Sequence, residues 1–146
     1  MLITRMEGRI VTALFEDSRA IQMDMEEEGA SSLGNIYVGK VKNIAKNINS
    51  AFVEFGDRQM AYYSLSDNPV HNFAMQGRQG SLKPGDDIII QISRDAVKTK
   101  DPVATANLSF TGRYCVLTCQ KSQITFSSKI NSQPWKEMIL QRLKPY

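Results

Sequence analysis

The sequence contains only one histidine and two cysteines among 146 residues, which limits the catalytic chemistry open to it. The histidine, His71, lies in a stretch rich in Gly, Pro, Asn and Ser, and such composition is typical of a solvated loop. No Ser–His–Asp set can be assembled around it, and neither G-x-x-x-x-G-K-[ST] nor G-x-G-x-x-G occurs. We therefore expect no catalytic residue in this chain.

The two cysteines, Cys115 and Cys119, fall in the segment RYCVLTCQ. In a strand they would share a face but lie roughly 13 Å apart, too far for a disulfide. A single C-x-x-x-C pair is not a zinc signature either, so we expect no metal site. We predict two buried, reduced core thiols in a cytoplasmic protein.

Long hydrophobic runs are also lacking. No stretch of eighteen or more apolar residues occurs, so no membrane span is expected. The N-terminal sequence MLITRMEGRI has no apolar core and no small-residue cleavage site, which argues against a secretory signal.

Charge is nearly balanced overall, at +3, but unevenly distributed. Residues 1–34 carry three basic and seven acidic groups, whereas residues 101–146 carry six basic and two acidic. The basic surplus after position 35 suits a polyanionic partner only weakly, because a surplus this small more often reflects ordinary solvation.

The alternation of apolar and polar residues predicts a mainly β protein. Residues 8–26 read as a β-hairpin, and the polar stretch EEEGASSLG (26–34) marks a boundary. Five short strands follow between residue 35 and about residue 105, with a long loop over residues 66–85. Five antiparallel strands with edges to close favour a small Greek-key barrel of the oligonucleotide/oligosaccharide-binding (OB) type, which binds oligonucleotides on one face.

The remaining residues flank this barrel. ATANLSFTGRYCVLTC and SQITFSSKI read as further strands. NSQPWKEMILQRLKP predicts a helix, with a cap at Asn131 or Ser132 and an apolar stripe. The predicted divisions are residues 1–33, 34–103 and 104–146.

Two large aromatics break the strand pattern. Ala51, Val53 and Phe55 share the expected core face of one strand, and Ala61, Tyr63 and Leu65 that of the next, whereas Glu54 and Ser64 are expected to point outward. Phe52 and Tyr62 then fall on the outward faces of adjacent strands. Proteins bind single-stranded nucleic acid with aromatic rings that stack on the bases and with nearby cations that contact the phosphates. The candidate cations are Lys40, Lys42, Lys98 and Lys100. A second small core under the long loop or the hairpin explains the rings equally well.

GNIYVGKVKNIAKNINSAFVEFGDRQMAYYSLSD resembles the start of the S-one RNA-binding domain of the ribonuclease E and ribonuclease G family. KTKDPVATANLSFTGRYCVL and ITFSSKI resemble later phrases of that family. The resemblance runs from about residue 8 to residue 130. It implies an S-one barrel inserted into an RNase H-like α+β subdomain, of which residues 1–33 and 104–146 would be parts.

The resemblance also implies an activity for the full-length family, which is a Mg²⁺-dependent endoribonuclease acting on single-stranded RNA in bacterial RNA processing and decay. Its RNA-holding residues align with Phe52, Tyr62 and Lys100. Its metal-binding aspartates and its oligomer contacts lie in regions absent here, so we expect no cofactor in this chain.

The sequence departs from the family pattern at several positions. Ala61-Tyr62 replaces Gly-Phe, Lys100-Asp101 replaces Lys-Gly, and Ser127-Ser128-Lys129-Ile130 has lost one basic group. Two alternatives to a ribonuclease segment remain: a free-standing RNA-binding regulator, and a barrel that binds protein through Phe52.

Overall fold

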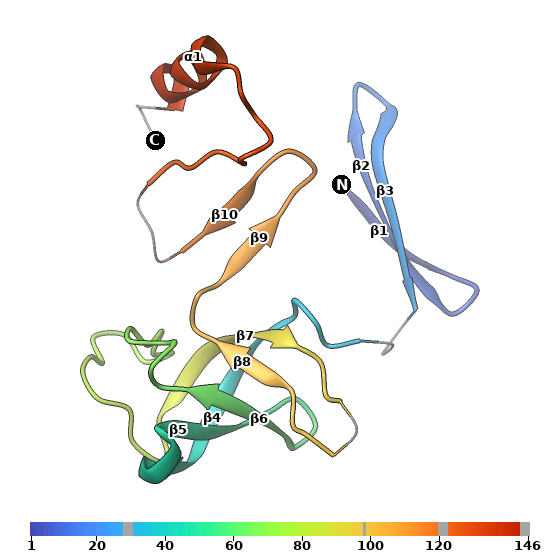
Figure 1. Ribbon diagram of the computed structural model, residues 1–146. Coiled ribbons are helices and arrows are strands. Elements are labelled where there is room, and N and C mark those ends of the chain that lie inside the picture. Colours follow the sequence, from blue (N-terminus) through green and yellow to red (C-terminus); the bar gives the residue numbers. More distant parts are fainter. Residues whose placement is uncertain (28–30, 98, 120–122, 144–146) are drawn as a thin grey trace. The chain divides into compact units, whose positions relative to one another are not determined.

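The structure is a computed structural model that describes residues 1–27, 31–97, 99–119 and 123–143 (Figure 1). It is mainly β, as predicted. The chain divides into two compact units, Met1–Leu108 and Ser109–Tyr146. The first unit contains an N-terminal sheet and a closed barrel.

The N-terminal sheet has three antiparallel strands in the order β1 (Leu2–Met6), β2 (Arg9–Glu16) and β3 (Arg19–Glu27). Strands β2 and β3 form the predicted hairpin. Their turn residues Asp17 and Ser18 have φ values of 45° and 66°, the pair of positive values that a type I′ hairpin turn requires. Strand β1 was not predicted, because its short run of mixed residues lacks a clean alternation.

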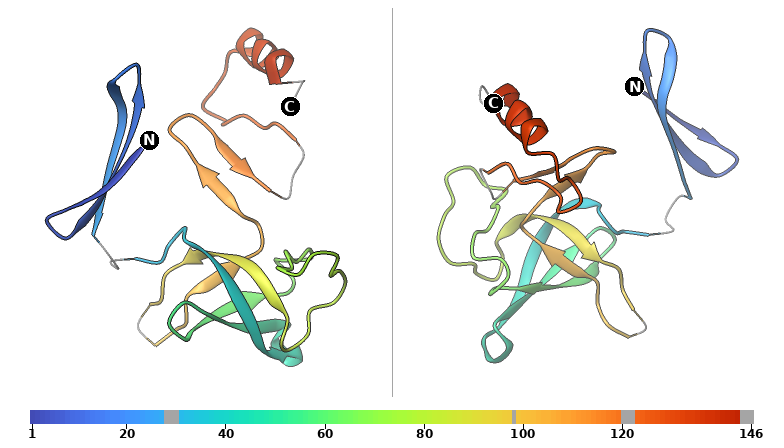
Figure 2. Two further views of the ribbon diagram at one scale, coloured as in Figure 1. Left: turned by 180° about the vertical axis from the view of Figure 1, so that it is seen from behind. Right: turned by 45° about the horizontal axis from the view of Figure 1, so that its top comes forward.

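The barrel comprises β4 (Ile36–Ala45), β5 (Ser50–Phe55), β6 (Gln59–Ser64), β7 (Asp87–Arg94) and β8 (Val103–Thr105). It closes in the order β4-β5-β6-β8-β7, with β7 pairing back to β4 (Figures 1 and 2). The β6–β8 pair is parallel and the others are antiparallel. This confirms the predicted five-stranded OB-type barrel.

Apolar side chains at alternate strand positions fill the barrel. The predicted inward residues of β5 are all buried, as are Ile88, Ile90 and Ile92 of β7, and Tyr63 of β6 is fully inaccessible. Burial of such side chains supplies most of the driving force for closure. The buried set is Val41, Ala51, Val53, Phe55, Ala61, Tyr63, Leu82, Ile88, Ile90, Ile92, Ala104 and Ala106.

One outward prediction was wrong. Ser64 is 8% exposed rather than solvated. Its hydroxyl accepts a hydrogen bond from the amide of Asp67 and lies 3.0 Å from the Ser66 hydroxyl, because the chain turns over it as β6 ends.

At Gly39, β4 passes very close to β5. A Cβ at this position would lie 2.5 Å from Val53 Cγ1 and 3.2 Å from the carbonyl oxygen of Glu54. Only a residue without a side chain lets β4 pass this close to β5 inside the closed barrel.

The second unit contains β9 (Ser109–Thr111), β10 (Val116–Thr118) and helix α1 (Gln133–Leu143). The predicted helix is confirmed, and the Ser132 hydroxyl accepts a bond from the amide of Trp135. Two predictions fail. Residues 123–130 form no strand. Cys115 and Cys119 are exposed, as are Val116 and Leu117 of β10, so this segment is not a buried strand. Assignment of this unit and the N-terminal sheet to an RNase H-like subdomain remains a prediction.

Candidate nucleic-acid interface

Phe52 and Tyr62 are directly opposite one another on β5 and β6. Their ring centroids are 6.3 Å apart and the ring planes meet at 77°, an edge-to-face contact. Both side chains are partly exposed on the outside of the barrel, because their neighbours Ala51 and Tyr63 take the inward positions. The sequence pattern therefore placed the two rings together correctly, on the strands whose outer face binds oligonucleotides in OB barrels.

A fully buried serine holds one of these rings. The Ser50 Oγ lies 2.9 Å from the carbonyl oxygen of Ile48 and 2.6 Å from the Tyr62 hydroxyl. A serine hydroxyl has one proton, and a carbonyl can only accept. Ser50 therefore donates to Ile48, and the Tyr62 hydroxyl donates to Ser50. This chain of two hydrogen bonds connects the ring to the short 3-10 helix η1 (Lys46–Ile48) that joins β4 to β5.

Lys40 and Lys42 lie on β4 beside this pair, as predicted, but each faces a carboxylate. The Lys40 Nζ is 2.8 Å from Asp87, and the Lys42 Nζ is 3.3 Å from Glu54. Both lysine side chains are about half exposed, so these are surface ion pairs of small energy. Because each lysine charge is partly compensated by a carboxylate, the two residues together attract a phosphate less than two unpaired lysines would.

Lys100 is exposed in the loop between β7 and β8, where its amide bonds to the carbonyl of Val97 across a tight turn. Two residues later, the carbonyl of Pro102 accepts a hydrogen bond of 2.8 Å from the amide of Tyr62. The loop therefore returns to the barrel at the edge of the aromatic pair. Lys98 lies outside the described residues.

Sequence reasoning missed Ser50 as a site residue and missed the irregularity in β4. The β4–β5 register shifts between Val41 and Asn43, with Lys42 at the shift. Neither feature has a local signature: a serine after KNIN reads as part of a turn, and a bulge follows from pairing between distant strands.

Within the described part of the chain, no three His, Cys, Asp or Glu side chains gather as a metal ion would need. In those residues, no helix combines the length and hydropathy needed to cross a bilayer.

Comparison with known proteins gives a consistent result. No family model matches the chain. Ribonuclease E of Synechocystis sp. is 31% identical over 130 residues, covering 87% of this chain and 19% of that protein. Ribonuclease G of Haemophilus influenzae is 24% identical over 157 residues, covering 100% of this chain and 32% of that protein. Ribonuclease E of a Nostoc species is 28% identical over 130 residues, with 87% and 19% covered.

These similarities confirm the resemblance to ribonucleases E and G that the motifs indicated. The chain spans about a fifth to a third of the length of these relatives, so the matches concern one region of much longer proteins.

Proposed function

We propose that the barrel binds single-stranded RNA, with Phe52 and Tyr62 as its base-stacking surface. The observation that carries this proposal is the cross-strand aromatic pair, partly exposed on the outer face of β5 and β6. Every base has a π face, so two rings there favour single strands without strong sequence preference. The similarity to ribonucleases E and G supports RNA as the polymer.

Positive charge completes this interface. Lys100, in the loop that returns beside Tyr62, would contact the RNA backbone as a point charge. Lys40, Lys42 and Lys98 would contribute further cations, with the first two competing against their carboxylate partners.

We further propose that this chain supplies the RNA-binding region of a ribonuclease E- or G-type endoribonuclease in RNA processing and decay, in the bacterial cytoplasm. The Mg²⁺ chemistry and the oligomer contacts of such an enzyme would depend on regions outside this chain.

Binding of a labelled single-stranded RNA, followed by fluorescence anisotropy, tests the proposal. Phe52→Ala and Tyr62→Ala should each weaken affinity by about 1–3 kcal/mol, the usual loss for one stacking ring, while the barrel stays folded. Tyr114→Ala is a matched control, because Tyr114 is an 89% exposed aromatic in the other unit and should leave affinity unchanged.

Three results would contradict the proposal or redirect it. Absence of salt-dependent RNA binding favours a protein-binding barrel. If Phe52→Ala or Tyr62→Ala lowers the melting temperature sharply but leaves RNA affinity unchanged, the rings belong to a core and not to an RNA-binding surface. RNA cleaved by the purified chain in the presence of Mg²⁺ would place catalysis in this chain.

A further inference from the structure

The loop of residues 65–86, between β6 and β7, is long and tightly anchored. Asn68 is almost fully buried; it donates to the carbonyl of Ser64 and accepts from the amide of Ala106, both at 2.7 Å. Asn72 donates to the carbonyl of Ala106 at 2.6 Å. Long ordered loops without regular structure are uncommon in small domains and usually functional. This one is held rigid by bonds that reach across to the end of β8.

The second half of the loop is held by Arg78. Its guanidinium pairs with the Asp86 carboxylate at 2.9 Å and lies 4.4 Å from the ring centroid of Phe73. It also donates to the carbonyls of Gln79 and Ser81. Burial alone would raise the pKa of Asp86, but the bond from the Lys83 amide and the guanidinium lower it. Asp86 is therefore ionised at neutral pH, and Arg78 carries no uncompensated charge.

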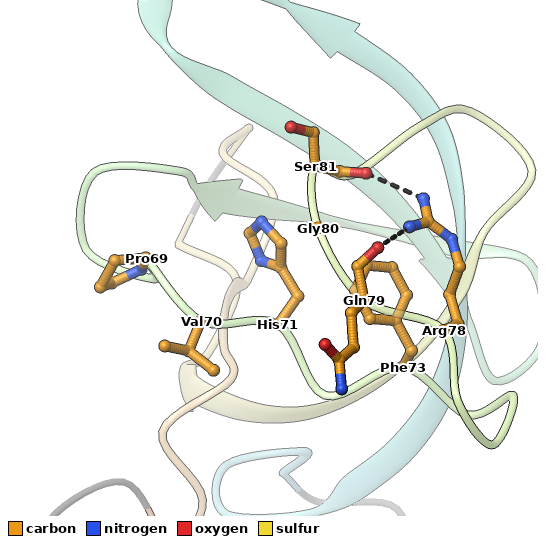
Figure 3. Close-up of a pocket in the computed structure, with 8 residues that line it drawn as sticks. All are labelled: Pro69, Val70, His71, Phe73, Arg78, Gln79, Gly80 and Ser81. Carbon is orange, nitrogen blue, oxygen red and sulfur yellow. Dashed lines mark hydrogen bonds between the residues drawn. The ribbon is translucent and has the colours of Figure 1, made fainter.

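These bonds shape a pocket of about 570 Å³ within the loop (Figure 3). Its volume lies in the range of small-molecule sites. Figure 3 shows His71 near the centre, with Pro69 and Val70 on one side of it and residues 79–81 on the other. The pocket is lined by Pro69, Val70, His71, Phe73, Arg78, Gln79, Gly80 and Ser81, none of which belongs to the Phe52–Tyr62 pair.

His71 gives the pocket a fixed, neutral hydrogen-bonding group. Its Nδ1 lies 2.9 Å from the hydroxyl of Tyr63, a residue with no solvent exposure. Burial lowers the pKa of His71, and the nearby Arg78 lowers it further against the opposing effect of Asp86. At neutral pH the imidazole is uncharged, its Nδ1 is held by Tyr63, and Nε2 remains its open hydrogen-bonding atom.

The geometry points to a nucleobase as the ligand of this pocket. The lining residues with uncharged polar side chains are His71, Gln79 and Ser81, and the apolar lining residues are Pro69, Val70 and Phe73. A phosphate would meet an arginine already neutralised by Asp86, whereas a flat heterocycle could use the donors and acceptors together with the apolar surfaces. The base comes either from the RNA strand, which rests on the function proposed above, or from a free nucleotide.

The first experiment asks whether the pocket binds bases. The chain is titrated, with amide shifts followed by NMR, with each of the four nucleoside 5′-monophosphates and with ribose 5-phosphate. The amides of His71, Gln79 and Ser81 should shift with at least one nucleotide and not with ribose 5-phosphate. Equal shifts with ribose 5-phosphate, or none with any nucleotide, would overturn the proposal.

Variants then tie the response to the pocket. Ser81→Trp places a large side chain at its exposed rim, and Gln79→Ala removes one polar group. Both should weaken nucleotide binding at least threefold. Gln76→Ala, an exposed glutamine of the same loop that does not line the pocket, is the matched control. If Ser81→Trp folds normally and binds nucleotide like the parent, the bound base is not in this pocket.

RNA of increasing length identifies the source of the base. If the strand supplies it, Ser81→Trp should lower the affinity of a twelve-nucleotide RNA about fivefold or more, the lower range for one base contact, and leave that of a trinucleotide unchanged. If Ser81→Trp weakens the binding of free nucleotides but not that of the twelve-nucleotide RNA, the pocket binds a free nucleotide. Phe52→Ala is measured in parallel, so loss of RNA binding at the aromatic pair and loss of the pocket are separate results.

Discussion

The hydroxyl of Tyr62 lies 2.6 Å from the Oγ of Ser50, a buried serine whose own proton goes to the carbonyl of Ile48. One ring of the proposed RNA surface is therefore oriented from beneath by a group that RNA cannot touch. Because Ile48 belongs to η1, which joins β4 to β5, the same serine links ring orientation to that connection.

The first prediction follows from this link. Ser50→Ala and Tyr62→Phe each break the hydrogen bond between the two hydroxyls and should each weaken RNA binding about threefold, because the ring is no longer held. The double variant should lose little more than either single variant, since the same contact is removed twice. A purely structural role for Ser50 would lower the unfolding free energy by about 1 kcal/mol and leave the RNA affinity of the folded protein unchanged. Measuring affinity and urea unfolding on all four proteins distinguishes the two.

The second prediction concerns Lys100. Each phosphate neutralised on a single strand contributes roughly 0.7 to the slope of log affinity against log salt concentration. Lys100→Ala should flatten that slope by about this amount, and less if the adjacent Asp101 offsets the field. Lys129→Ala, at an exposed lysine of the other unit, serves as the control. Parallel lines for Lys100→Ala and the parent would exclude Lys100 as a phosphate contact.

The third prediction tests barrel closure. Gly39→Ala would place a methyl group 2.5 Å from Val53 Cγ1, and Val53 is itself fully buried. The strands must separate or Val53 must leave its rotamer, at a cost of about 1–3 kcal/mol in unfolding free energy. Gly112→Ala, whose added Cβ would have its nearest contact at 3.4 Å, should change stability by no more than about 0.5 kcal/mol. Equal urea midpoints for the two variants would show that β4 has room to move.

The barrel was predictable because its strands carry their own signal. Ile88, Ile90 and Ile92 alternate with polar or half-buried neighbours, and a period of two assigns them to one face before any partner strand is known. The same rule put Phe52 and Tyr62 outward. The same rule misassigned Ser64, the last residue of β6. The chain folds back over this residue and buries it, although its position in the alternating pattern is that of an outward residue.

Cys115 and Cys119 show where prediction from the local sequence fails. Their segment is apolar enough to predict a buried strand, but burial requires a neighbouring surface. Among the described residues, β10 pairs with β9 alone. Local propensity cannot supply that surface.

The sequence by itself determined which side chains face the interior of the barrel, since strand periodicity is a local property of the chain. Tertiary structure alone decided that Ser50 would hold Tyr62, that Lys40 and Lys42 would meet carboxylates, and that His71 would reach the hydroxyl of Tyr63. These contacts depend on the register between strands and on where a long loop returns. Both follow from closing the whole barrel, in which every strand must satisfy two neighbours at once.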